Sequence, residues 1–316
     1  MQTIVVASFG GADQLRLVER PAPSPAAGEA LIAVEAVGVG YVDVMAREGR
    51  YPLIKTPGFI PGAEVAGQVE AVGEGVPPEW VGERVFARTS TGAYAQKVAA
   101  PVSRLARLPD SVSAATAVAL GVNALVAHFA LERVRLQPAE AVLVRGAGGG
   151  IGVMTVQLAH GLGADVTAVT SSVARGERLA ALGARQILNR KAQDEADLGD
   201  FDVVVDTVGG AELGRRLEKL KPNGRYILCG GAGGMPAADF GQALLTTFHR
   251  SPSFYALSLN SIDDAQLRTA ARTLFKAAAE GRLEAVIDQT LPLGRAGDAH
   301  RRLEAGQVFG KLVLTP

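Results

Sequence analysis

The chain has 316 residues, 48% of them hydrophobic, and its 32 Lys and Arg residues balance its 32 Asp and Glu residues. This length is sufficient for two domains with large hydrophobic cores, while a formal net charge of zero excludes a long-range field that would gather nucleic acid or an anionic membrane surface. A single cysteine excludes an intrachain disulfide and a cysteine-rich zinc site, and is typical of the reducing cytoplasm in which we expect the protein.

The first segment, Met1–Ala7, has no basic region ahead of its apolar run, and we interpret it as a strand and not as a signal peptide. Up to about residue 110, short apolar runs such as Ala30–Val37 and Val65–Val72 alternate with Gly and Pro. This pattern predicts an irregular, mostly antiparallel β domain.

An Ala-rich apolar stretch from Ala114 to Leu131 follows Ser113, a residue type that caps helices. The stretch is long enough to cross a membrane. Because Thr, Gly, Asn and His residues interrupt it, we expect a buried pair of helices between domains instead of a membrane span.

Strands and helices then alternate along the chain, which predicts a parallel sheet with helices on both faces. The predicted strands are Val142–Arg145, Asp165–Thr170, Gln186–Leu188, Val203–Asp206, Arg225–Cys229 and an edge strand at Tyr255–Leu259. The predicted helices are Ile151–Leu162, Arg175–Leu182 and Leu213–Leu220. A helix over Asp263–Glu280 and strands at Ala285–Ile287 and Lys311–Leu314 complete the chain.

The fold class predicted from this order is α/β. We expect a nucleotide-binding domain over residues 116–255, inserted in a mostly β catalytic domain that begins with residues 1–115. Residues 256–316 would supply the edge strand and then return to the catalytic domain. A cleft between two such domains is the expected site.

The run Ala141–Gly152 is the most informative motif of the chain. An apolar strand enters a glycine-rich turn and a helix follows, which would place a dinucleotide pyrophosphate against backbone N–H groups at the helix N-terminus. The turn departs from the strict G-x-G-x-x-G pattern, but the strand before it and the helix and strand after it supply the context that this motif requires. The expected cofactor contacts are Ala147, Gly148, Gly149, Gly150, Ile151 and Gly152.

The end of the next strand distinguishes between cofactors. An NAD site usually has an Asp or Glu there to bind the ribose 2′-OH, whereas this strand leads into Ser171 and Ser172, with Arg175 beyond. Hydroxyls and a guanidinium suit a 2′-phosphate, so we expect NADPH. Alternatively, one serine caps the helix and Arg175 is solvated. Arg190, after the third strand, is either a second phosphate ligand or an exposed arginine.

The order and spacing of several short segments resemble the medium-chain dehydrogenase/reductase superfamily, and within it the zinc-independent NADPH:quinone oxidoreductases related to zeta-crystallin. These segments are Gly38–Asp43, Gly49–Pro52, Pro61–Gly67, Gly82–Phe86, Ala147–Gly152, Asp206–Gly210 and Gly310–Leu314. The resemblance covers nearly the whole chain. It implies a Rossmann doubly wound sheet inserted in a GroES-like catalytic domain that is built from both chain ends.

Zinc-dependent alcohol dehydrogenases of this superfamily carry a Cys near the position of Tyr41 or Val42 and a His at the position of Ala63. This chain lacks these ligands, and its histidines are scattered, so we expect no metal. Oxidation of an alcohol is hard without a metal that lowers the hydroxyl pKa. Hydride transfer to a quinone or an enone depends mainly on positioning the nicotinamide against an electrophilic acceptor.

Tyr51 matches a cleft tyrosine of the family and is a candidate proton donor, or else it anchors a loop beside Pro52. Asn123 is predicted to bind the nicotinamide amide, because its side chain both donates and accepts, or else to cap a helix after Gly121. By resemblance, further cofactor contacts are expected from Tyr41, Val208, Gly209, Cys229, Gly230, Gly231 and Lys311.

The leading hypothesis is therefore an NADPH-dependent reductase of quinones or related α,β-unsaturated carbonyl compounds. The alternatives are an enoyl-thioester reductase and an NADPH-binding structural or regulatory protein with little turnover. No nucleic acid or membrane partner is expected. The resemblance also implies a homodimer or homotetramer, in which the apolar segment Phe254–Leu259 pairs with its two-fold mate.

Overall fold

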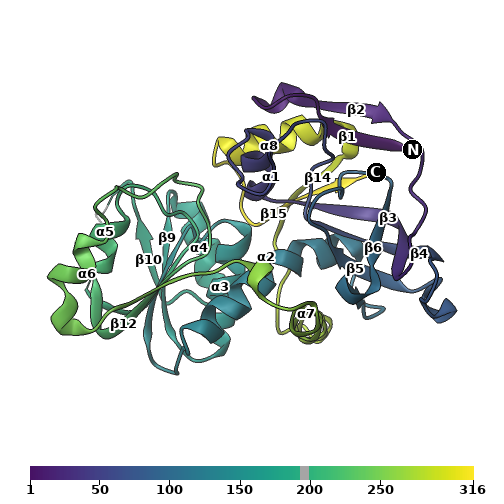
Figure 1. Ribbon diagram of the computed structural model, residues 1–316. Helices are drawn as coiled ribbons and strands as arrows, with labels where there is room; N and C mark the ends of the chain where they lie inside the picture. Colours follow the sequence, from purple (N-terminus) through teal and green to yellow (C-terminus); the bar gives the residue numbers. More distant parts are fainter. Residues whose placement is uncertain (193–198) are drawn as a thin grey trace. The chain divides into compact units, whose positions relative to one another are not determined.

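The computed structural model describes residues 1–192 and 199–316, and the chain divides into two compact units. Residues 1–122 and 263–316 form one unit, and residues 123–262 form the other, which is therefore inserted in the first (Figure 1). The first division lies within helix α2 (Ala114–Arg133), whereas the boundary predicted from the sequence lies at the beginning of that helix.

The outer unit is built on a seven-stranded sheet with the order β14-β15-β3-β4-β5-β7, and β6 pairs with β3. The pairings among β3 to β7 are antiparallel, as predicted, and β15 lies antiparallel to β3, so the C-terminal strand completes a sheet that the N-terminal half began. Its strands are β3 (Glu29–Val39), β4 (Glu64–Val72), β5 (Arg84–Arg88), β6 (Lys97–Pro101), β7 (Leu105–Arg107), β14 (Ile287–Pro292) and β15 (Lys311–Thr315).

A separate antiparallel pair and three helices complete the outer unit together with the first part of α2. The pair is β1 (Gln2–Val6) and β2 (Leu15–Glu19), and the helices are α1 (Tyr41–Arg47), α7 (Asp264–Ala279) and α8 (Ala296–Glu304). Short 3-10 turns occur in this unit at Ala12–Gln14, Pro78–Trp80, Val102–Arg104 and Leu293–Arg295, and in the inserted unit at Phe248–Arg250 and Leu259–Ser261. Apolar side chains from the inner faces of the strands, among them Ile32, Val65 and Leu312, form the core.

Helix α2 confirms the buried helix pair that the interrupted apolar run predicts. The Ser113 hydroxyl accepts the N–H of Thr116 at 3.1 Å and caps the first piece. The backbone then leaves helical geometry at Gly121 (φ 10°, ψ −117°), where the second piece begins. Within the described part of the chain this is the helix that is long and apolar enough to span a membrane, and 72% of its apolar window is buried inside the protein.

The inserted unit contains a six-stranded parallel sheet with the order β10-β9-β8-β11-β12-β13. This is the strand order of the doubly wound dinucleotide fold, and it confirms the predicted fold class. The strands are β8 (Ala141–Arg145), β9 (Asp165–Thr170), β10 (Gln186–Asn189), β11 (Phe201–Asp206), β12 (Leu220–Leu228) and β13 (Ser253–Ala256). The helices are α3 (Gly150–Gly161), α4 (Val173–Ala181), α5 (Leu213–Leu217) and α6 (Gln242–Thr246).

Several predicted elements have other bounds in the structure. The edge strand predicted at Tyr255–Leu259 is Ser253–Ala256, and the strand predicted at Ala285–Ile287 is Ile287–Pro292. Helix α5 stops at Leu217, because the Phe201 N–H donates to the Lys219 carbonyl at 2.9 Å and draws the following residues into β12. The edge strand forms as β13, with Phe254 paired to Tyr226 in parallel register. The sheet therefore ends at β13 on one side and at β10 on the other.

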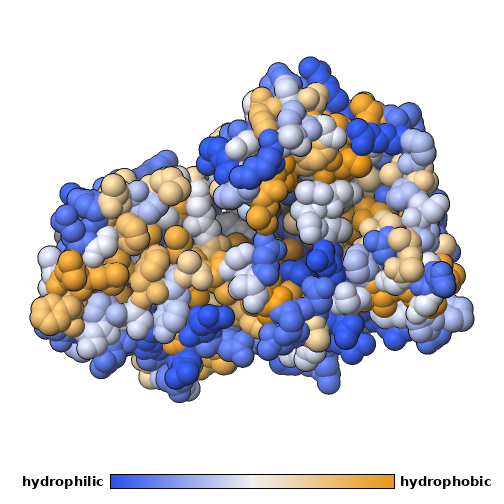
Figure 2. All heavy atoms as spheres, in the orientation of Figure 1, coloured by the Kyte–Doolittle hydropathy of each residue, from blue (hydrophilic) through white to orange (hydrophobic). Residues whose placement is uncertain are grey.

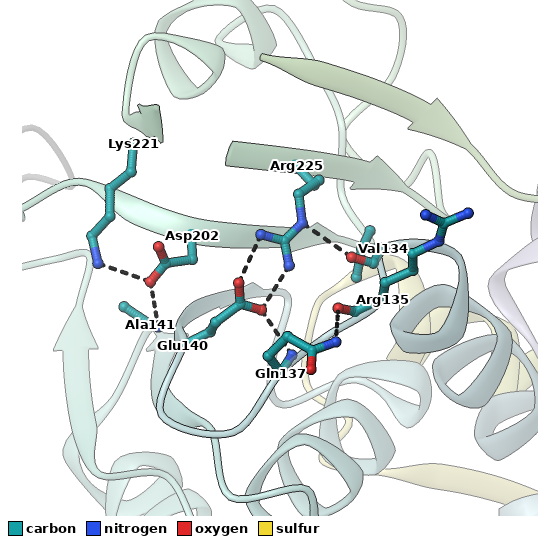
Figure 3. A network of polar contacts seen from close by, with 8 residues as sticks. All are labelled: Val134, Arg135, Gln137, Glu140, Ala141, Asp202, Lys221 and Arg225. Atoms are coloured by element: carbon teal, nitrogen blue, oxygen red, sulfur yellow. Dashed lines mark hydrogen bonds and ion pairs between the residues drawn. The ribbon is translucent and has the colours of Figure 1, made fainter. Parts of the chain in front are cut away.

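A network of hydrogen bonds and ion pairs links the amino ends of β8 and β11 to β12 (Figure 3). Arg225 binds both carboxylate oxygens of Glu140 at 2.8 and 2.6 Å and donates through Nε to the carbonyl of Val134 at 3.0 Å. Asp202 accepts the N–H of Ala141 and the Lys221 ammonium, each at 2.8 Å. Burial alone would raise the pKa of Glu140, but the hydrogen bonds from Arg225 and from the Gln137 N–H outweigh it and lower the pKa.

Candidate functional site

The glycine-rich turn lies between the carboxyl end of β8 and the first turn of α3. The N–H of Gly149 donates to the carbonyl of Gly146 at 2.9 Å and closes the turn. Gly146 has a φ of +67°, a conformation that favours glycine. Gly149 is the N-cap residue of α3, so the first N–H groups of a twelve-residue helix are presented at this edge of the sheet.

Close packing around the turn requires the absence of side chains at two positions. A Cβ on Gly152 would lie 2.2 Å from the Gly146 carbonyl oxygen and 2.6 Å from the Ala147 Cα. A Cβ on Gly150 would lie 2.4 Å from the Asn123 amide nitrogen. Asn123, predicted to bind the nicotinamide, therefore packs directly against the glycine-rich turn. It is 7% exposed and lies beside the start of α3.

The residues predicted to select the cofactor lie at the carboxyl ends of β9 and β10. Ser172 is the N-cap of α4, and its hydroxyl accepts the N–H of Arg175 at 3.3 Å. The N–H of Arg190 donates to the Thr170 carbonyl at 3.0 Å, which brings the residue after β10 beside the end of β9. Ser171, Ser172 and Arg175 are half-buried and Arg190 is exposed, and all four residues follow β9 or β10 at the same edge of the sheet.

Val208 and Gly209, predicted to contact the cofactor through their backbone, follow β11 directly. Their N–H groups both donate to Oδ1 of Asp206, at 2.7 and 3.0 Å. The Val208 carbonyl accepts the N–H of Gly233 at 2.7 Å. These three backbone groups are bonded within the protein, so a cofactor contact at Val208 and Gly209 would have to use their other atoms.

Asp206 is a further functional candidate, to which the motif Asp206–Gly210 in the sequence assigns no role. It is fully buried, and its Oδ2 accepts a hydrogen bond from Arg145 Nη1 at 2.6 Å and another from the Tyr226 hydroxyl. Burial, with the nearby Asp206 charge, raises the pKa of Tyr226 far above its usual value, so the phenol is the donor. The sequence signal for this residue is an acid at the end of a buried strand, directly before a glycine-containing turn.

Cys229, Gly230 and Gly231 follow β12 at the same edge. The Cys229 N–H donates to the Asp206 carbonyl at 2.9 Å, and a Cβ on Gly230 would lie 2.2 Å from the Thr207 carbonyl oxygen. Burial, and secondly the Asp206 charge, raise the pKa of the Cys229 thiol to about 12. The thiol is therefore protonated at neutral pH and unsuited to act as a nucleophile.

Tyr41 and Tyr51 lie in the outer unit. Tyr41 is the first residue of α1, half-buried, and hydrogen-bonded with Arg50. Tyr51 is half-buried in the loop that follows α1, and its carbonyl accepts the N–H of Ile54 at 3.1 Å.

Lys311, a predicted cofactor contact, also lies in the outer unit, and its side chain points into the protein interior. Its side chain is 4% exposed, and its ammonium lies 2.5 Å from Oε1 of Glu64. The other oxygen of Glu64 accepts the N–H of Val122 at 2.7 Å. A Cβ on Gly38 or on Gly121 would lie 2.6 or 2.2 Å from this carboxylate, so both glycines make room for it.

A second chain of buried polar side chains begins at Asp43, a residue of α1. Asp43 accepts the N–H of Gly40 at 2.8 Å and the Tyr94 hydroxyl at 3.1 Å, and that hydroxyl lies 3.1 Å from His300 Nε2. Burial raises the pKa of Asp43 to about 6 and lowers that of His300 to about 3, so His300 is neutral at physiological pH. Across residues 1–192 and 199–316, no group of three or more His, Cys, Asp and Glu residues is arranged to hold a metal ion.

Comparison with known proteins places these features in context. Residues 26–110 match the family model described as alcohol dehydrogenase GroES-like domain, and residues 182–314 match the one described as zinc-binding dehydrogenase. The chain is 30% identical to quinone oxidoreductase of Rattus norvegicus over 99% of this chain and 97% of the rat protein. It is 29% identical to the synaptic vesicle membrane protein VAT-1 homolog of Danio rerio, over 99% of this chain and 70% of that protein.

Among solved structures, quinone oxidoreductase of Escherichia coli complexed with NADPH is similar over the full length of both chains. The TM-score is 0.92 and the sequence identity is 27%.

Proposed function

This chain belongs to the quinone oxidoreductase family of the medium-chain dehydrogenases and reductases, and from that premise we propose that it is an NADPH-dependent, zinc-independent reductase of quinones or related α,β-unsaturated carbonyl compounds. The observation that carries the proposal is the edge of the inserted sheet. A turn that admits only glycine at two positions opens α3, and residues with hydroxyl and guanidinium side chains follow β9 and β10.

This edge fits the parts of NADPH one by one. The N–H groups at the start of α3 suit the pyrophosphate. Ser171, Ser172, Arg175 and Arg190 suit the 2′-phosphate, which distinguishes NADPH from NADH. The Asn123 amide, beside Gly150, suits the nicotinamide carboxamide because it both donates and accepts.

When bound, NADPH supplies the hydride, and the chain's own residues bind and orient the reactants. Turn and arginine residues hold the dinucleotide, while Asn123 orients the nicotinamide. Tyr51 is the proposed proton donor to the oxygen or carbon that becomes basic as the acceptor is reduced. No metal is required, because a quinone or enone is already electrophilic.

The test is NADPH oxidation by the purified protein with small ortho- and para-quinones, followed by a short enoyl-coenzyme A. We expect turnover with at least one quinone. Faster turnover with the enoyl thioester would replace the quinone assignment with an enoyl reductase. Tight NADPH binding without turnover on any acceptor would contradict the enzymatic proposal and favour a binding protein with little turnover.

The Arg175→Ala substitution is expected to raise the KM for NADPH about tenfold or more, and to leave the KM for NADH nearly unchanged. The reason is the loss of a charge-assisted hydrogen bond to the 2′-phosphate, which NADH lacks. Steady-state kinetics with both cofactors measure the effect. The matched control is Arg185→Ala, because Arg185 is an exposed arginine that pairs with Asp165 at the other end of β9. Equal losses for NADPH and NADH would contradict the role of Arg175.

The Tyr51→Phe substitution is expected to lower kcat by about 10²-fold if the phenol donates a proton in the rate-limiting step. NADPH binding should not change, because the substitution removes one oxygen from a loop residue. Tyr255→Phe, which removes the phenol of a β13 residue, is the control for general effects of losing a hydroxyl. A Tyr51→Phe variant with wild-type kcat on both quinone and enone would reduce Tyr51 to a structural role.

We also propose a cytoplasmic homodimer or homotetramer that forms through the edge of the inserted sheet. Strand β13 ends that sheet. Nearby, Leu245 and Phe248 are each 74% exposed, and Figure 2 has apolar surface at the end of this unit where α6 lies. Pairing of β13 with the same strand of a second copy would provide hydrogen-bond partners for its unpaired backbone groups and cover the exposed apolar side chains. Sedimentation of the wild-type chain distinguishes monomer, dimer and tetramer.

A further inference from the structure

Three buried side chains join the carboxyl ends of three strands at the proposed cofactor edge. Arg145 ends β8, Asp206 ends β11, and Tyr226 lies near the end of β12. They are 7%, 0% and 0% exposed, and Asp206 accepts hydrogen bonds from both of the others. A carboxylate removed from water in this way needs its cation and its donors, because an uncompensated buried charge is strongly unfavourable.

The second oxygen of Asp206 determines the shape of the following turn. It accepts two successive backbone N–H groups, those of Val208 and Gly209. Gly209 and Gly210 then adopt φ values of +66° and +88°, so the chain turns back sharply. One carboxylate thus stabilises both the strand ends and a turn that requires glycine.

The same turn contacts the glycine-rich turn directly. The Thr207 hydroxyl donates to the Arg145 carbonyl at 3.0 Å, and a Cβ on Gly146 would lie only 2.2 Å from that hydroxyl. The Cys229 N–H donates to the Asp206 carbonyl at 2.9 Å. A shift of Asp206 would therefore displace the residues at the carboxyl ends of β8, β11 and β12 together.

We propose that Asp206, with Arg145 and Tyr226, is a positioning group for the dinucleotide: it holds the turn after β11 in the shape that NADPH binding requires. The inference rests on the proposed NADPH-dependent function. Asp206 acts through the turn and does not itself touch the cofactor, since all four of its side-chain hydrogen bonds are made within the protein. Arg145 balances its charge beside a site that must accept phosphates.

A rescue experiment tests this role. In Asp206→Asn the amide oxygen still accepts the two backbone N–H groups, but the amide NH₂ faces the Arg145 guanidinium, donor against donor. We expect the dissociation constant for NADPH to rise about tenfold or more. Adding Arg145→Met removes the clash and leaves the NH₂ to donate to the Tyr226 oxygen, so the double variant D206N/R145M should return to within about threefold of wild type.

A third variant removes the acceptor while it keeps the site uncharged. D206L/R145M leaves the Val208 and Gly209 N–H groups without the carboxylate, and we expect NADPH binding to weaken about tenfold or more. The control is E140Q/R225M, which neutralises the ion pair at the opposite ends of the strands (Figure 3). It should lower the midpoint of thermal unfolding and leave the NADPH dissociation constant unchanged.

The outcomes separate the inference from the function on which it rests. If D206N/R145M binds NADPH no better than D206N, or if folded D206L/R145M binds it as wild type does, the positioning role is wrong. If D206L/R145M does not fold, the comparison of D206N with D206N/R145M still decides. If wild-type protein does not bind NADPH at all, the proposed function fails, whatever the variants do.

Discussion

Replacement of Gly152 by alanine is expected to abolish measurable NADPH binding and to destabilise the inserted unit by about 1–3 kcal/mol or more. The added Cβ would lie 2.2 Å from the Gly146 carbonyl oxygen and 2.6 and 2.8 Å from the Cα and carbonyl carbon of Ala147. All three are backbone atoms and cannot rotate away, as the end of a flexible side chain can. Either α3 moves away from β8 or the turn opens, and both changes displace the N–H groups that suit the pyrophosphate.

The measurements are the thermal unfolding midpoint and the NADPH dissociation constant. The matched control is Gly161→Ala at the other end of α3, where an added Cβ would meet no atom within 4 Å. Alanine there should be neutral or stabilising by about 0.4–1 kcal/mol, because it restricts the unfolded chain. Similar losses of binding in the two variants would show that helix α3 tolerates no substitution in general, and would contradict the specific role of Gly152.

Removal of the Lys311 ammonium, by Lys311→Met, is expected to lower the free energy of unfolding by about 3–5 kcal/mol. Its partner Glu64 is 2% exposed and would keep an uncompensated charge inside the outer unit. The double variant E64Q/K311M should recover most of this loss. The Gln oxygen can still accept the N–H of Val122, and no charge remains buried.

Urea unfolding of the wild type, the single variant and the double variant measures these differences. Lys97→Met is the control, because Lys97 and Glu70 form an ion pair of 2.7 Å in the same sheet, with side chains 36% and 38% exposed. An exposed pair of this kind contributes about 0–1 kcal/mol. A Lys311→Met variant no less stable than Lys97→Met would contradict the importance of the buried pair.

The elements that could be predicted are those whose signal lies within a few neighbouring residues. The alternation of apolar strands and helices predicted the parallel sheet, and the turn Gly146–Gly152 predicted its own strand–turn–helix context, because spacing and glycine content act locally. The same kind of local signal predicts the break in α2, since polar and glycine residues interrupt the apolar run around Gly121. The end of α5 cannot be predicted from its own residues, because a hydrogen bond from Phe201, on strand β11, determines where β12 begins.

The sequence by itself determined the doubly wound fold, the glycine-rich turn, and the position of serine and arginine residues directly after β9. Only the tertiary structure decided that Lys311 binds Glu64, 247 positions away in the chain, and that Asp206 pairs with Arg145 and Tyr226, 61 and 20 positions away. The physical reason is the range of the interactions. A turn or helix follows from adjacent residues, whereas the partner of a buried charge depends on which distant segments the fold brings together, and no local pattern in the chain encodes that choice.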